Sequence, residues 1–137
     1  MKESLDPNWL GNEEEEIYKD NIIDHYKNPR NFGELEKAEI NESELNPVCG
    51  DMIKLFVKLD ERKKVKDVKF KGNGCAISVA ATSMLTEELK GKSLEDIKKI
   101  SKEDIFNMLG IKLGVVRMKC GLLCLNTLNK GIKNMEK

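Results

Sequence analysis

The spacing of apolar side chains predicts a helix in the first part of the chain. In residues 17–27, Tyr18, Ile22 and Tyr26 recur every four residues, which places them on one face of an α-helix. Asn28-Pro29 follows directly. Because the residue before a proline disfavours helical geometry, we expect the helix to end there.

A period of two then replaces the helical period. Residues 51–59 alternate between apolar and polar side chains, which predicts a strand. Its apolar face carries Ile53, Leu55, Val57 and Leu59. Residues 36–45 and 65–71 are weaker strand candidates, and the connections among the three segments are short. Short connections predict an antiparallel meander with one solvated face, in which 36–45 could be an edge.

Helical spacing returns after Gly72-Asn73-Gly74, a run that we expect to break the sheet. Residues 75–90 are rich in Ala, Val, Met and Leu, and Gly91 after them is a typical helix stop. We therefore expect the third strand to end by residue 71 and a helix to occupy 75–90.

Two serines downstream mark further helix starts. The pairs with capping-box spacing are Ser93 with Asp96 and Ser101 with Asp104. A last helix is expected from about Val116, with one apolar stripe formed by Cys120, Leu123, Cys124, Thr127 and Leu128. An N-terminal helix, a three-stranded antiparallel sheet and C-terminal helices predict an α+β, two-layer domain.

Composition narrows the classes of function. The 137 residues carry 24 basic and 24 acidic side chains, so the formal net charge is zero. Neither a nucleic acid nor an anionic membrane would be attracted by such a balance, and 5% aromatic residues offer few stacking platforms for bases. We expect an acidic flexible tail at 1–16 and one domain at 17–137. With no apolar run of membrane-spanning length, we expect a cytoplasmic protein with reduced cysteines.

Three of the four cysteines share a local pattern. Cys49, Cys75 and Cys120 each lie beside a glycine and at a predicted element boundary, so segments far apart in sequence could meet at the rim of the domain. The N-terminal end of a helix favours a thiolate, which applies to Cys75 and plausibly to Cys120. Asp51 lies two residues after Cys49 in an extended segment and faces the same side. Three thiolates and one carboxylate could bind zinc or iron. Spacing alone leaves two interpretations open, a metal or sulfur site and three unrelated thiols.

Cys124 and His25 have simpler interpretations. Cys124 lies one turn after Cys120 on the apolar stripe, which favours a packed core residue over a ligand. His25 is the only histidine, and no nucleophile pairs with it in sequence. Packing or hydrogen bonding is therefore favoured over catalysis.

Four segments of the chain resemble a known family. They are IIDHYKNPRNFG (22–33), NPVCGDMIKL (46–55), FKGNGCAISVAATSML (70–85) and RMKCGLL (117–123), and GKSLEDI (91–97) also fits. In this order and at these spacings they are similar to the U-type iron–sulfur cluster assembly proteins, which comprise IscU, SufU and the N-terminal part of NifU.

The resemblance implies a scaffold rather than an enzyme. Cys49, Asp51, Cys75 and Cys120 would hold iron or a labile [2Fe–2S] cluster on exposed thiolates, with Cys120 as the persulfide acceptor. The implied partners are a cysteine desulfurase as sulfur donor and acceptor apo-proteins or carriers. The alternative is a zinc-dependent sulfurtransferase of the SufU type, in which Zn²⁺ occupies the same site.

The chain departs from the family pattern before Cys120. Lys119 stands where IscU proteins have histidine, as in SufU-type members, and we interpret it as an electrostatic neighbour of Cys120. Residues 113–117 read LGVVR in place of the Leu-Pro-Pro-Val-Lys segment that a chaperone recognises in IscU, so chaperone contact is not implied. The 45-residue step from Cys75 to Cys120 is too short for the usual SufU insertion.

Overall fold

The computed structural model describes residues 20–47, 50–111 and 113–136. The expected tail at 1–16 and Cys49 lie outside this part of the chain. In chain order the elements are α2 (Asp20–Lys27), β1 (Ile40–Asn46), β2 (Asp51–Leu59), β3 (Val65–Asn73), α3 (Ala76–Leu89), α4 (Leu94–Lys98), α5 (Lys102–Leu109) and α6 (Val115–Met135). The α+β class is confirmed.

The sheet is antiparallel with the order β1-β2-β3, so β1 is an edge strand as expected. Strand β2 has the predicted bounds, and all four side chains of its apolar face are buried. The expected start of the first strand at residue 36 is wrong, because β1 begins at Ile40. Lys37 adopts φ 59° in a turn just before it, and a left-handed residue cannot continue an extended strand.

The expected break at Gly72-Asn73-Gly74 is also wrong, because β3 continues to Asn73. Gly72 pairs with Ile53, and Asn73 pairs with Met52. A Cβ on Gly72 would collide with the backbone oxygen of Met52. Glycine at this position permits the close approach of two strands. The sequence alone does not distinguish this role of a glycine from a role in a turn.

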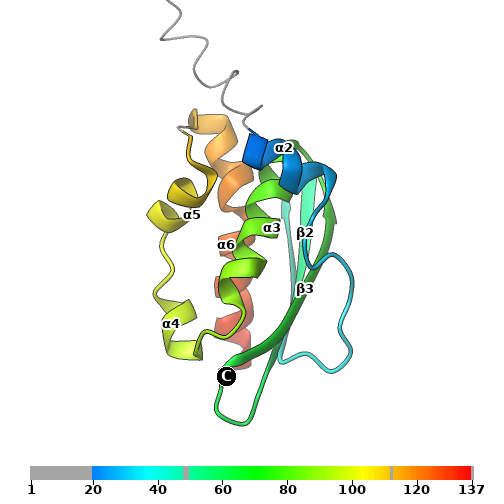
Figure 1. Cartoon of the computed structure of the whole chain (residues 1–137), viewed down its shortest axis with the longest axis vertical. Helices are drawn as coiled ribbons and strands as arrows, with labels where there is room; N and C mark the ends of the chain where they lie inside the picture. The colour runs from blue at the N-terminus through cyan, green and yellow to red at the C-terminus, as the bar shows by residue number, and fades with distance from the viewer. Residues whose placement is uncertain (1–19, 48–49, 112, 137) are drawn as a thin grey trace, which may run out of the picture.

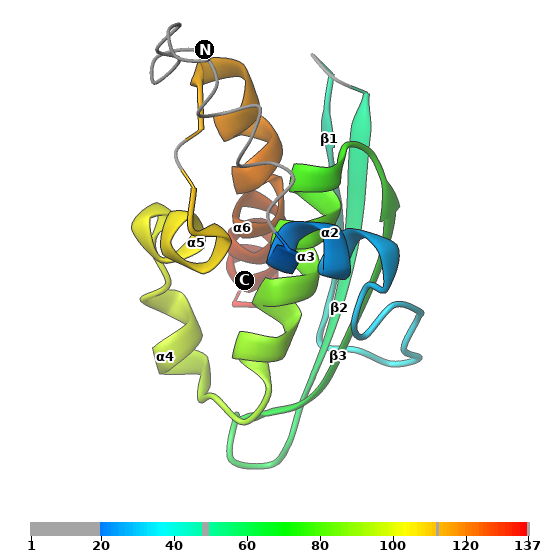
Figure 2. The ribbon, with the colours of Figure 1, turned by 45° about the horizontal axis from the view of Figure 1, so that its top comes forward.

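The helices form a layer on one side of the sheet. In Figure 1, α3 and α6 lie between the sheet and the shorter helices α4 and α5. Figure 2 shows α2 across the upper part of α3, and both α3 and α6 contact the sheet. Of the α2 stripe, Ile22 is fully buried against this core, Tyr26 is exposed and Tyr18 lies outside the described residues.

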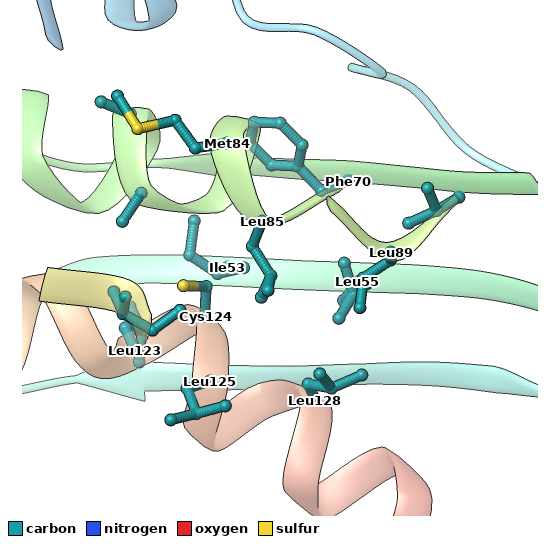
Figure 3. Close-up of a cluster of buried hydrophobic side chains, with 14 of the residues drawn as sticks. Ile53, Leu55, Phe70, Met84, Leu85, Leu89, Leu123, Cys124, Leu125 and Leu128 are labelled. Atoms are coloured by element: carbon teal, nitrogen blue, oxygen red, sulfur yellow. The ribbon is translucent and has the colours of Figure 1, made fainter. Parts of the chain in front are cut away.

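The core is formed where α3 and α6 face the sheet. Figure 3 shows side chains from all these elements in contact range, namely Ile53 and Leu55 of β2, Phe70 of β3, Met84, Leu85 and Leu89 of α3, and Leu123, Cys124, Leu125 and Leu128 of α6. The predicted stripe of the last helix is buried along its length. Apolar burial of this kind is the main source of stability for the fold.

Helix α3 is buried almost all round because the sheet, α2, α5 and α6 all contact it. Two of its buried hydroxyls donate within the helix: Thr82 donates to the Ser78 oxygen at 2.7 Å, and Thr86 donates to the Ser83 oxygen at 2.7 Å. Ser83 Oγ in turn lies 2.7 Å from His25 Nδ1. The hydrogen-bonding role expected for His25 is therefore confirmed, and it joins α2 to α3.

Both predicted helix caps are present. Ser101 and Asp104 form a complete reciprocal box at the start of α5, whereas Ser93 accepts from the Asp96 amide at the start of α4. Helix α6 is the longest described, with 21 residues. None of the described helices combines the length and apolarity needed to cross a membrane.

Candidate metal centre

Three of the four predicted ligands lie together. One carboxylate oxygen of Asp51 and the sulfurs of Cys75 and Cys120 are all within 4.8 Å of one another. Asp51 is the first residue of β2, Cys75 is the N-cap of α3, and Cys120 is in the second turn of α6. The fourth predicted ligand, Cys49, lies outside the described residues. The fold thus brings together side chains from three distant segments.

The Asp51 carboxylate is held by the chain that leads into α3. The Cys75 amide donates to Asp51 Oδ1 at 3.3 Å, and the Cys75 sulfur lies 3.9 Å from Oδ2. Gly74 makes this approach possible: a Cβ there would lie 2.5 Å from Asp51 Oδ1. Asp51 is 2% exposed, so its orientation is fixed by protein contacts rather than by solvent.

Cys75 has its sulfur available although it occupies a capping position. Its side chain makes no capping hydrogen bond to the described first turn of α3. Ser78 Oγ donates to the Cys75 carbonyl at 3.1 Å and fixes the main chain there. The thiol is partly exposed, so Cys75 is the accessible sulfur of the described group.

The candidate ligands are more buried than the exposed thiolates that we expected. The Cys120 side chain is 2% exposed and Asp51 equally so, and only Cys75 of the three is partly open to solvent. The expectation is therefore wrong for Cys120. The physical reason is that Cys120 lies on the face of α6 that packs against the core.

The helix-terminus argument does not extend to Cys120. Helix α6 begins at Val115, which places Cys120 beyond the first turn. The unpaired amides and the field of a helix terminus act within that first turn. Cys75, by contrast, directly precedes α3.

Asn46 is a further residue of this site, and the sequence pattern did not predict it. Its side-chain amide Nδ2 lies 3.7 Å from the Cys120 sulfur, within the range of an N–H···S hydrogen bond. It is 5% exposed. The NPVCGDM motif contains this residue, but an asparagine before a proline is also the usual mark of a turn, so the sequence did not separate the two roles.

Lys119 precedes Cys120 in α6 and is exposed. Successive helical side chains diverge by about 100°, so the buried Cys120 and the exposed Lys119 face different directions. The electrostatic role assigned to Lys119 stays a prediction.

Cys124 lies outside the candidate centre. It is 1% exposed, its sulfur donates to the Gly121 oxygen at 3.6 Å, and burial raises the pKa of its thiol to about 12. The thiol therefore stays protonated at neutral pH and packs as a small apolar side chain. The core assignment of Cys124 is confirmed.

The donor set fits a thiophilic metal. Two sulfurs and one carboxylate oxygen suit tetrahedral zinc or iron better than magnesium or calcium. A tetrahedral zinc–thiolate site has ligand atoms about 3.8 Å apart, given bonds of about 2.3 Å. The separations of the described ligand atoms, all within 4.8 Å, exceed this spacing by at most roughly 1 Å.

Known proteins resemble this chain in sequence. A model of the "NifU-like N terminal domain" matches residues 17–137. An iron-sulfur cluster assembly enzyme IscU from Drosophila melanogaster is 39% identical over 110 residues, covering 78% of this chain and 70% of that protein. A zinc-dependent sulfurtransferase SufU from Bacillus subtilis is 38% identical over 137 aligned positions, covering 88% of this chain and 92% of that protein.

Solved structures agree with the sequence relatives. A putative iron-sulfur cluster assembly scaffold protein for the SUF system from Fervidobacterium islandicum has a TM-score of 0.71 at 33% identity, over 85% of this chain and 96% of that one. A NifU-like N-terminal structure from Brucella abortus, at 17% identity, shows the same fold with a TM-score of 0.73 over 89% of this chain and 96% of that one. The chain belongs to the NifU-like N-terminal domain family.

Proposed function

We propose that this protein is an iron–sulfur cluster assembly scaffold. It accepts sulfur from a cysteine desulfurase, binds iron at Cys49, Asp51, Cys75 and Cys120, assembles a labile [2Fe–2S] cluster and transfers it to acceptor proteins. The observation that carries the proposal is the convergence of Asp51, Cys75 and Cys120 from β2, α3 and α6. Relatives described as iron–sulfur assembly proteins support it.

Cys120 is the proposed sulfur acceptor. Its thiolate attacks the outer sulfur of the donor persulfide, a new S–S bond forms on Cys120, and the donor cysteine leaves as a thiolate. This transfer needs no oxidant or reductant. Converting each bound sulfur to sulfide then takes two electrons, which a dithiol supplies in the assay below.

The mixed donor set suits a cargo that must leave. Thiolates bind iron strongly, whereas a carboxylate is a harder and more exchangeable ligand. Asp51 therefore weakens one corner of the site relative to an all-cysteine site. Cys75, the partly exposed member, gives an acceptor a point of contact.

A second function uses the same residues. In a zinc-dependent sulfurtransferase, Zn²⁺ occupies the site and persulfide sulfur is relayed from the desulfurase. The Bacillus subtilis relative bears that name. Lys119 directly before Cys120 also fits the SufU-type pattern that the sequence resembles. Because the ligands are the same, geometry does not separate the two functions.

Metal content and reconstitution separate them. Protein purified anaerobically is analysed for iron and zinc, then given Fe²⁺, cysteine, a desulfurase and a dithiol while visible absorption is recorded. The scaffold predicts sulfide-to-iron charge-transfer bands that are lost in Cys75→Ala. Cys124→Ala is the matched control and retains them, because its sulfur is outside the centre.

The contrary result is equally specific. Stoichiometric zinc that resists exchange, faster desulfurase turnover and no charge-transfer bands would reject the scaffold and support the sulfurtransferase. Loss of metal in Cys124→Ala would contradict the assigned ligand set.

A further inference from the structure

Asn46 joins two parts of the candidate centre. It is the last residue of β1 and pairs with Asp51 across the hairpin. Its backbone oxygen accepts the Gly50 amide at 2.7 Å and closes the connection. Its side chain extends in the other direction, to the sulfur of Cys120, 74 residues later in the chain.

We infer that Asn46 is a positioning residue of the proposed metal or cluster site, whose side-chain amide donates an N–H to the Cys120 sulfur. The inference deepens the proposed function and depends on it. Both groups are buried, with Asn46 5% and Cys120 2% exposed, so water does not compete effectively for the bond. The contact therefore fixes the direction of the Cys120 sulfur toward Asp51 and Cys75.

An amide is suited to this position because it donates without carrying charge. Another carboxylate beside Asp51 and two thiolates would add repulsion in a poorly solvated space. A lysine would compete for the thiolate as a buried ion pair with a large desolvation cost. Asparagine supplies the donor with neither penalty.

The bond also alters the sulfur as a metal donor. An N–H donated to a thiolate withdraws electron density, and such contacts change metal affinity and the reduction potential of iron–sulfur centres. With the amide in place, Cys120 gives less electron density to the metal than a bare thiolate would. The sulfur-to-metal charge-transfer energy measures this effect directly.

A purely structural role has a different signature. The Gly50 hydrogen bond uses the backbone of Asn46, so side-chain substitution leaves it in place. If Asn46 only shaped the hairpin, substitution would lower the unfolding temperature and leave the metal spectrum unchanged. Unfolding temperature and spectrum are therefore measured together.

Co²⁺ serves as the probe, since its thiolate charge-transfer bands are intense and iron and zinc sites accept it. Asn46→Leu keeps a similar shape without the donor, and Asn46→Ala is the second variant. Asn41→Ala is the matched control, because Asn41 is an exposed residue of the same strand. In both Asn46 variants we expect a lower charge-transfer energy, because the N–H is lost, and roughly tenfold weaker Co²⁺ binding, because the direction of the Cys120 sulfur is no longer fixed. The control matches the unmodified protein.

Each other outcome is decisive. Folded Asn46 variants with the charge-transfer energy and affinity of the unmodified protein would overturn the inference alone. Loss of folding in both variants would assign Asn46 to the hairpin and also overturn it. If the unmodified protein itself binds neither Co²⁺ nor iron at these cysteines, the proposed function fails and the inference with it.

Discussion

Gly74 shows how much of the site depends on a missing side chain. Its φ is +151°, and an added Cβ would lie 2.5 Å from Asp51 Oδ1 and 2.7 Å from Ser78 Oγ. Neither neighbour is a flexible side-chain end in open solvent, since both are buried. The carboxylate and the start of α3 can approach each other only across a glycine.

We expect Gly74→Ala to displace the Asp51 carboxylate and to weaken metal binding at least tenfold, with a smaller loss of unfolding temperature. Competition titration with Co²⁺ measures the affinity. Gly91→Ala is the comparison, because φ is +84° there and an added Cβ meets nothing within 4 Å. That variant also introduces backbone strain, but it involves no collision and lies away from the candidate centre. Equal affinities in the two variants would show that strain, not displacement of Asp51, is responsible.

At the scale of single residues, the sequence predicted which residues form the candidate centre better than it predicted their burial and contacts. Glycine neighbours and element boundaries predict Cys75 and Cys120 as ligands, and the two-residue step from Cys49 predicts Asp51. The structure brings these three side chains together. The sequence carried two conflicting indications for Cys120: its place on the apolar stripe of the last helix predicted burial, whereas the proposed ligand role predicted an exposed thiol. The structure agrees with the stripe. Asn46 was not predicted, because its contact is made across 74 residues, and no local pattern reports it.

His25 links two helices through a single hydrogen bond. Its Nδ1 lies 2.7 Å from Ser83 Oγ, and Ser83 Oγ also accepts the Arg30 amide at 2.9 Å. Burial, followed by the charge of Arg30, lowers the pKa of His25, while Glu87 and Asp24 act in the opposite direction. The imidazole is thus held neutral where α2 packs on α3.

The sign of the resulting pH dependence follows from that shift. The pKa of His25 is lower in the folded state than in the unfolded chain, where it is about 6.5, so protonation favours unfolding. We expect the stability due to His25 to be complete above pH 6.5 and to fall as the pH drops toward the folded-state pKa, by at most about 1.4 kcal/mol per pH unit. Thermal unfolding between pH 7.5 and 5 measures it.

His25→Gln provides the comparison, since it keeps a hydrogen-bonding group that does not titrate. The chain has no other histidine, so this variant should lose most of the pH dependence in that range. Identical pH profiles for the two proteins would contradict the assignment to His25.

Elements were predicted well where the pattern was strong. The alternation of apolar and polar residues in 51–59 predicted the bounds of β2, and the serine–aspartate pairs located the starts of α4 and α5. The predicted start of the first strand and the predicted end of the third strand were wrong. The sheet begins at Ile40 because Lys37 has a positive φ, and β3 extends to Asn73 because Gly72 allows the strands to approach closely. The spacing of hydrophobic residues reports neither of these causes.

Taken as a whole, the molecule has its candidate centre where the two layers meet. Asp51 comes from the sheet, and Cys75 and Cys120 come from the two helices that cover it. An ion held by all three is therefore bonded to both layers. Because the unfolded chain has no such preformed arrangement, binding free energy adds to folding free energy.

We expect Zn²⁺ or Fe²⁺ to raise the unfolding temperature by several degrees, since free metal at a hundred times its dissociation constant adds about 2.7 kcal/mol. Anaerobic scanning fluorimetry with and without metal measures the change. Cys75→Ala should lose the rise, whereas Cys124→Ala should retain it. An equal rise in Cys75→Ala would place the metal elsewhere on the protein.

The burial of Cys120 has a consequence for timing. With 2% of its surface accessible, its sulfur cannot meet a donor persulfide in line without a shift of the chain around it. Under the proposed function, we expect sulfur acceptance to include a conformational step that exposes this thiol. Between deliveries, the same burial reduces the contact of the Cys120 sulfur with oxidants in solution.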